Sequence, residues 1–175
     1  ADADARISDQ VAEVNTAMAN IDSLNTEIGQ RKALGQSTAD LRDQRDQLLV
    51  QVNEKMSITS FERPNGEITV LAPGGNLMLD DTRLPISFVA TNTFVAGNTV
   101  QPIQISTGST TVSISADVSA GDGSLAGLLR IRDTLLPTVQ TALDDLAFEI
   151  ATNLATVSVG GVNEAVNLFT DAGGT

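Results

Sequence analysis

Two segments of this 175-residue chain carry aliphatic side chains at alternating steps of three and four, and this spacing constrains the fold more than any other feature. The repeat averages ~3.5 residues, so the side chains line one narrow face of a helix, as in helices that pack side by side. We call these two faces the helix-packing seams. The first seam comprises Val11, Val14, Met18, Ile21, Asn25 and Ile28, and the second comprises Leu136, Val139, Leu143, Leu146, Ile150 and Asn153.

The seams find no obvious partner within the sequence, which predicts contact with helices of neighbouring subunits. Asn25 and Asn153 are their polar members, and a buried amide at such a position costs stability but fixes register and partner. For Asn25 the alternative is a place near the helix surface, with Leu24 rotated inward. The heptads begin almost at the first residue, at Ile7, so we expect the chain to be a piece of a longer protein.

The first helix is expected over residues 6–34, and Gly35 can end it as a left-handed cap. Residues 37–40 resemble a capping box and start a second helix that runs to about Met56, antiparallel to the first or sharply bent from it. Charges alternate along this second helix and predict structural ion pairs on a partly solvated face. The charged residues are Arg42, Asp43, Arg45 and Asp46.

The hydrophobic period changes from helical to alternating at Ile58. Strands are expected at residues 58–61 and 68–71, joined through Pro64-Asn65-Gly66, because Asn-Gly is a strong hairpin signal. Further strands are expected near residues 76–79, 86–89, 101–106 and 111–116. No charged residue lies between Leu84 and Ala116. Neutral strands of this kind suit a sheet that stacks against itself or against a neighbouring subunit.

The chain returns to helix after the glycine-rich residues 121–124, where Asp122 or Ser124 can cap the helix start. This helix is expected to run to Val157, interrupted or bent near Pro137. The predicted fold class is therefore α+β, with long antiparallel helices and an inserted antiparallel β-domain of sandwich or barrel type. The domains are residues 1–57 (helix pair), 58–119 (all-β), 120–157 (returning helix) and 158–175 (an irregular tail or the start of a further domain).

The composition excludes most chemistry. The chain has no histidine, cysteine, tryptophan or tyrosine, so the commonest metal ligand, the thiol nucleophile and the best base-stacking residues are absent. A net charge of −12 without a basic stripe argues against nucleic acid and anionic membranes as partners. Asp43 and Asp46 could form an acid/base pair, but the two neighbouring arginines favour ion pairs. We expect no catalytic residue, no metal and no cofactor.

Several motifs occur in order along the chain. The first two are Leu24-Asn25-Thr26-Glu27-Ile28 and Asp40-Leu41-Arg42-Asp43-Gln44-Arg45-Asp46, and the next two are Gly74-Gly75-Asn76-Leu77 and Gly123-Ser124-Leu125-Ala126-Gly127-Leu128-Leu129-Arg130-Ile131-Arg132-Asp133. In this order and at this separation they resemble the family of flagellar hook-associated protein 1, over most of residues 11–157. Together they are much more specific than any one of them.

This resemblance implies a structural adaptor at the hook–filament junction of the bacterial flagellum. The implied partners are copies of the protein itself, hook subunits, filament-side hook-associated subunits and a cytosolic export chaperone. The implied location is extracellular, reached through the flagellar type III channel without a cleaved signal peptide. The alternative is a surface-exposed adhesion or phage-tail module with a helical stalk and a β head. An enzyme, such as a wall hydrolase, ranks third.

Overall fold

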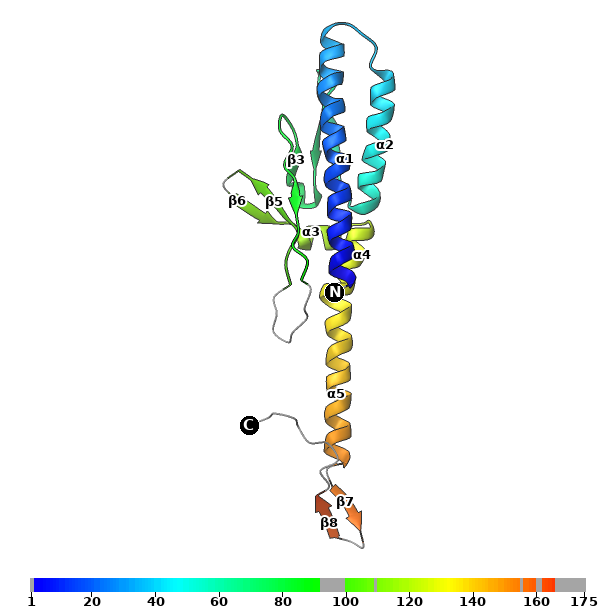
Figure 1. Ribbon diagram of the computed structural model, residues 1–175, viewed down its shortest axis with the longest axis vertical. Coiled ribbons are helices and arrows are strands. Elements are labelled where there is room, and N and C mark those ends of the chain that lie inside the picture. Colours follow the sequence, from blue (N-terminus) through cyan, green and yellow to red (C-terminus); the bar gives the residue numbers. More distant parts are fainter. Residues whose placement is uncertain (1, 92–99, 109, 155, 160–161, 166–175) are drawn as a thin grey trace. The chain divides into compact units, whose positions relative to one another are not determined.

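The computed structural model describes residues 2–91, 100–108, 110–154, 156–159 and 162–165. The chain divides into two compact units, residues 1–133 and 134–175. The first unit contains two long helices and two small sheets (Figure 1). The second contains one long helix and a β-hairpin. Long antiparallel helices with inserted antiparallel sheets confirm the predicted α+β fold class.

Helices α1 (Asp2–Ala33) and α2 (Ala39–Lys55) run side by side in opposite directions (Figure 1). As predicted, α1 is followed by Gly35 in the left-handed region, at φ +70°. Helix α2 starts where the sequence indicates, but the capping prediction is wrong, because the Thr38 side chain makes no capping hydrogen bond. Asp40, in the first turn of α2, instead faces the Arg31 guanidinium at 3.5 Å.

The strands of the first unit form two separate three-stranded antiparallel sheets. The first contains β1 (Thr59–Glu62), β2 (Ile68–Leu71) and β3 (Leu77–Leu79), and the second contains β4 (Ile86–Ser87), β5 (Gln104–Thr107) and β6 (Thr110–Ser113). A short 3₁₀ turn, η1 (Pro73–Gly75), precedes β3. The predicted hairpin through residues 64–66 is confirmed: the Gly66 N–H donates to the Arg63 carbonyl at 2.9 Å, and the Arg63 N–H donates to the Glu67 carbonyl at 2.7 Å.

Two short helices, α3 (Ser115–Ala120) and α4 (Ser124–Arg130), follow the second sheet. Gly123 lies between them at φ +105°, and a Cβ atom there would lie 2.5 Å from the Lys55 carbonyl oxygen at the end of α2. The predicted capping by Asp122 or Ser124 is wrong, since Gly123 is the N-cap and no side chain caps α4. The Ser124 hydroxyl donates instead to Gln10 of α1, at 2.8 Å.

One continuous core joins the helices to the sheets in the first unit. Its members come from α1, α2, β2 to β5, α3 and α4; the largest fully buried ones are Ile7, Met18, Ile21, Met56, Met78, Leu79, Ile103, Ile105, Ile114, Leu125 and Leu129. Because the core is shared, the predicted domain boundaries after residues 57 and 119 fall inside this unit. The sheets rest on the helices and do not form a core of their own.

The predicted interruption of the last helix near Pro137 is present, but the helix ends before the predicted Val157. A π-helical turn, η2 (Ile131–Leu135), separates α4 from α5 (Leu136–Leu154). Pro137 accounts for the break, because it lacks an N–H and its ring crowds the carbonyl of Asp133, four residues earlier. The helix then ends before Val157, which lies in β7 (Thr156–Val159), paired with β8 (Val162–Ala165). The β-branched Thr156, Val157 and Val159 favour strand over a continued heptad.

Candidate helix-packing surfaces

The first seam lies inside the first unit. Val11, Val14, Met18, Ile21 and Ile28 are 0–5% exposed. Four of them join the core with residues of α2, the sheets and α4. The prediction that this seam packs against a helix of a neighbouring subunit is therefore wrong for α1, because other elements of the same chain cover the seam.

Asn25 is buried in the first seam, at 3% exposed, but its partner is a strand rather than a helix. Its amide nitrogen donates to the Ile68 carbonyl at 2.8 Å, and its amide oxygen accepts from the Ile68 N–H at 3.0 Å. The same oxygen lies 3.4 Å from Nη1 of Arg45, which also donates to the Gly66 carbonyl at 2.8 Å. The Asn25 side chain thus occupies the place of a neighbouring strand beside β2.

Asn15 makes the same kind of contact with the second sheet. Its nitrogen donates to the Ile86 carbonyl at 2.7 Å, and its oxygen accepts from the Ile86 N–H at 3.0 Å. Two amides of α1 therefore saturate the backbone of one residue in each sheet. Sequence reasoning missed Asn15, since it lies off the seam and resembles an ordinary solvated polar residue.

A buried ionic cluster surrounds Arg132, which is 2% exposed. Its Nε and Nη2 atoms bind the two carboxylate oxygens of Asp133 at 2.5 and 3.0 Å. Its Nη1 atom lies 3.1 Å from the Gln101 carbonyl and 3.5 Å from the carboxylate of the fully buried Asp4. The guanidinium also stands 5.5 Å from the centre of the Phe88 ring, within cation–π range.

The neighbouring carboxylates favour the charged form of Arg132. Burial alone would lower the pKa of Arg132, but the hydrogen bond and charge of Asp133, followed by those of Asp4, raise the pKa above its ordinary value. Asp4 also accepts a hydrogen bond from the Thr91 N–H at 2.8 Å. The cluster ties the first turn of α1 to η2 and to the segment after β4. The sequence feature that could have indicated this cluster is Asp4, which lies three residues before Ile7 and so continues the spacing of the first seam.

Of the four predicted ion-pair residues of α2, Arg45 and Asp46 lie within pairing distance of each other as expected, whereas Arg42 pairs outside its own helix. Arg42 pairs with Glu62 of β1 at 2.9 Å. Arg45 is 3% exposed and lies 3.9 Å from Asp46, and its burial lowers the pKa of the guanidinium against the opposing charges of Asp46 and Glu62. Among the described residues, Asp43 is exposed and forms no ion pair. The arginines of α2 therefore hold the first sheet and its hairpin rather than their own helix.

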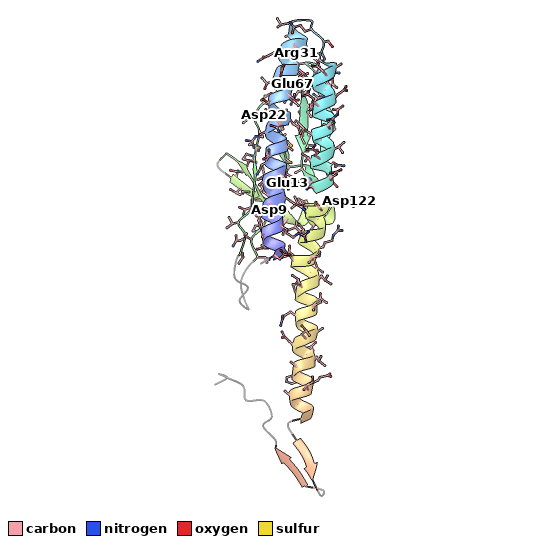
Figure 2. The ribbon with its side chains drawn as sticks, turned by 45° about the vertical axis from the view of Figure 1, so that its right-hand side comes forward. Asp9, Glu13, Asp22, Arg31, Glu67 and Asp122 are labelled. Atoms are coloured by element: carbon pink, nitrogen blue, oxygen red, sulfur yellow. The ribbon has the colours of Figure 1, made fainter. Side chains whose placement is uncertain are left out.

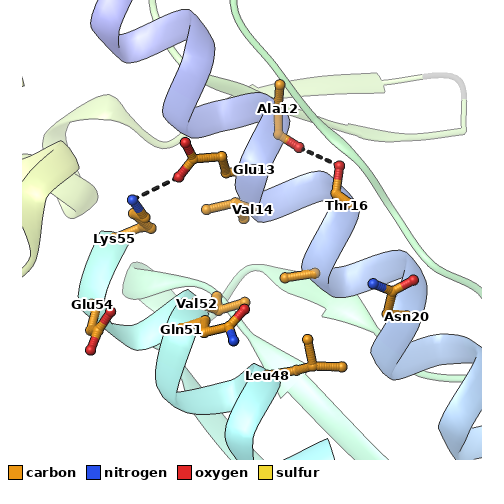
Figure 3. A pocket seen from close by; sticks show the side chains of 11 residues that line it. Ala12, Glu13, Val14, Thr16, Asn20, Leu48, Gln51, Val52, Glu54 and Lys55 are labelled. Carbon is orange, nitrogen blue, oxygen red and sulfur yellow. Dashed lines mark hydrogen bonds and ion pairs between the residues drawn. The ribbon is translucent and has the colours of Figure 1, made fainter.

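A groove of about 570 Å³ lies between α1 and α2 (Figure 3). Val14, Leu48 and Val52 form its apolar floor, and the Glu13–Lys55 ion pair, at 2.7 Å, crosses one end. Helix α1 carries acidic side chains along its length, at Asp9, Glu13 and Asp22 (Figure 2). The groove offers no converging titratable pair suited to catalysis.

Within the second unit, the apolar side chains of the second seam are exposed from Leu136 to Ile150. Its five apolar side chains, from Leu136 to Ile150, share one arc of the helix, about 80° wide at 100° per residue. Their exposed fractions are 47% for Leu136, 47% for Val139, 55% for Leu143, 53% for Leu146 and 42% for Ile150. The side chain of Asn153 lies outside the described residues. Residues 133–175 contain acidic residues but no lysine or arginine, so this apolar stripe is flanked by negative charge only.

The described part of the chain contains no cluster of three acidic side chains that could hold a metal ion. Among its helices, none combines the length and the apolar composition that a bilayer span requires. The surfaces that stand out are thus packing surfaces: the sealed face of α1 and the open stripe of α5.

Comparisons with known proteins agree with this geometry. The model of the family described as "Flagellar hook-associated protein FlgK helical domain" matches residues 1–169. One matching solved structure is that of the flagellar hook junction protein FlgK from Burkholderia pseudomallei, with a TM-score of 0.60 and 19% sequence identity. The likeness covers 75% of this chain and 23% of that protein, and at this identity it shows the fold alone. No curated protein sequence matches the chain.

The family match spans nearly all of the 175 residues. It agrees with the ordered motifs and with the observed helix pair and inserted sheets. The chain therefore belongs to the FlgK family of flagellar hook-associated proteins, structural proteins of the hook–filament junction, and represents part of their helical domain.

Proposed function

We propose that the chain acts as a structural adaptor at the hook–filament junction and works by subunit packing without catalysis. Family membership supports the junction role. The observation that carries the packing mechanism is the α5 stripe, whose five large apolar side chains are 42–55% exposed. A half-exposed aliphatic side chain gains about 1 kcal/mol when its remaining surface is covered. A stripe of five such side chains is therefore a contact surface of useful strength.

The partners that we propose are copies of the protein, hook subunits, filament-side hook-associated subunits and, before export, a cytosolic chaperone. The protein is exported without a cleaved signal peptide and works outside the cell. The all-acidic flanks of the α5 stripe favour helices that carry lysine or arginine beside their apolar face, because opposite charges support register and orientation across a helix pair.

A complementation experiment tests this proposal. The gene that contains the chain is deleted from its own bacterium and restored either unchanged or with Leu143→Glu plus Leu146→Glu. The matched control is Thr138→Glu plus Thr141→Glu, which adds the same charge to the opposite side of α5. Electron microscopy counts hooks with and without filaments, and the medium is assayed for unassembled filament subunits.

We expect the deletion and the stripe variant to show bare hooks with filament subunits released to the medium, whereas the control carries filaments. Circular dichroism of the purified variants checks that both remain folded. Normal filaments in the deletion strain would refute the junction role. Normal filaments in the stripe variant alone would refute packing through α5.

A further inference from the structure

The two sheets of the first unit have four edges; other parts of the chain cover two of them, and a third carries a charged residue. The β4 edge is saturated by Asn15, through both backbone groups of Ile86. The β3 edge is covered by the returning chain, where Leu79 bridges to Arg83 and the Leu84 N–H donates to the Met78 carbonyl at 2.8 Å. The β1 edge carries the charged Glu62, paired with Arg42. Covering elements and charges are the usual means of preventing strand addition.

The β6 edge has none of these features. β6 is the last strand of its sheet (Figure 1). All four of its residues, from Thr110 to Ser113, are exposed. The Ile114 N–H donates inward to the Ile103 carbonyl at 2.9 Å. Because inward and outward groups alternate along an antiparallel strand, Val112 and Thr110 also point their backbone groups toward β5. Thr111 and Ser113 therefore direct their N–H and C=O groups outward, and no described residue binds these groups.

The distribution of charge along the chain favours a second copy of the chain as the partner for this edge. The whole net charge of −12 lies outside residues 84–116, which contain no charged residue. Two copies of such an acidic chain repel each other over most of their surfaces but not here. We propose that two copies of the chain pair edge to edge through β6, as antiparallel strands that extend the β4–β5–β6 sheet across a two-fold axis.

The strand itself sets the register. Thr111 of one copy faces Ser113 of the other, and the two residues exchange both backbone hydrogen bonds. Val112 then lies on the axis, directly opposite Val112 of the second copy. Its side chain is 39% exposed and meets an identical apolar side chain there. Of the possible two-fold registers, this one uses every outward group of β6.

The proposed contact is a closed two-fold interface. A two-fold interface joins two copies and cannot extend into a ring, so the pair is separate from the junction contacts proposed above and does not depend on them. Four residues a side are also far below the ~1,000 Å² that a stable interface buries. The pair is therefore weak and is best detected by trapping it covalently.

The chain has no cysteine, so a single introduced thiol reports one position. The test compares Val112→Cys with Thr110→Cys in the full 175-residue chain under mild oxidation, by non-reducing electrophoresis and mass measurement. The register places the two Val112→Cys positions opposite each other, where a disulfide can form, and separates the two Thr110→Cys positions by about 13 Å, which is too far. A third variant adds Thr111→Pro to Val112→Cys and removes one outward N–H.

We expect Val112→Cys to form linked dimers at least ~10-fold faster than Thr110→Cys, since pairing raises the local thiol concentration. Linking should speed up in about 0.5 M salt, which screens the repulsion between the two acidic chains, and Thr111→Pro should reduce it to the control rate. Equal rates for the two thiols, no linked dimer, or slower linking in high salt would each overturn the proposal. A normal rate in the Thr111→Pro variant would overturn the backbone pairing.

Discussion

Asn25 shows how one amide can hold a helix to a sheet. Its two hydrogen bonds to Ile68 replace those of a missing strand, and its oxygen also faces the buried Arg45. A buried backbone group left without a partner costs about 1–3 kcal/mol, so the amide matters more for the groups that it satisfies than for its own packing. The same logic applies to Asn15 at the second sheet.

We predict that Asn25→Leu lowers the free energy of unfolding by about 2–4 kcal/mol, because it leaves two backbone groups without a partner and removes one acceptor from the buried Arg45 guanidinium. Asn20→Leu, on the exposed side of the same helix, should change it by no more than about 0.5 kcal/mol. Urea denaturation followed by circular dichroism measures both. Similar values for the two variants would mean that Asn25 is not a structural clamp.

Arg132 and Asp4 make the second prediction at this scale. Arg132→Met should destabilise the first unit by about 3–5 kcal/mol, because it leaves the buried Asp4 carboxylate without its cation. Adding Asp4→Asn should recover at least ~1 kcal/mol, since the uncompensated charge disappears. A double-mutant cycle by denaturant unfolding checks this, and strictly additive losses would contradict the coupling.

At the scale of elements, the close approach of α4 to the end of α2 depends on a residue without a side chain. Gly123→Ala places a Cβ atom against the Lys55 carbonyl at a positive φ, so we expect a loss of at least ~2 kcal/mol. Gly127→Ala is the matched control: it lies inside α4 with open space around it and should stabilise by about 0.5–1 kcal/mol. Thermal unfolding of the two variants should shift in opposite directions.

The hydrophobic periodicity of the sequence predicted where helices and strands lie better than it predicted what packs against them. It predicted α1, α2 and the hairpin through residues 64–66, because helical and alternating apolar patterns depend on local sequence. It could not say what covers a seam. The α1 and α5 stripes look alike in sequence, yet the first is buried by distant strands and the second is exposed. The β7 strand was missed because valines at seam spacing also suit a strand.

The ionic contacts were the least predictable feature. Arg42 and Arg45 have acidic neighbours in sequence, but Arg42 pairs with Glu62 and Arg45 donates to the Gly66 carbonyl. Each partner lies about twenty residues away. A charge pattern within one helix shows only the pairs that the helix itself allows, and a sheet that packs against it offers others.

At the scale of the whole molecule, the division into two units has a thermodynamic consequence. Every residue of the continuous core lies within residues 1–133, and the second seam lies outside it. Most of the stability of the first unit comes from burial of that core, so it should not depend on the α5 stripe. Residues 1–133 are therefore expected to fold without the rest of the chain.

We predict that a protein truncated after residue 133 unfolds in one cooperative transition, with a midpoint close to that of the full chain. In the full chain, Leu146→Asp should leave this transition unchanged because Leu146 is 53% exposed, whereas Val14→Asp should abolish it because a charge replaces a side chain that is 1% exposed. Differential scanning calorimetry distinguishes these outcomes. A truncated protein that does not fold, or a Leu146→Asp variant that melts like Val14→Asp, would mean that α5 contributes to the stability of the first unit and is not a surface kept free for other subunits.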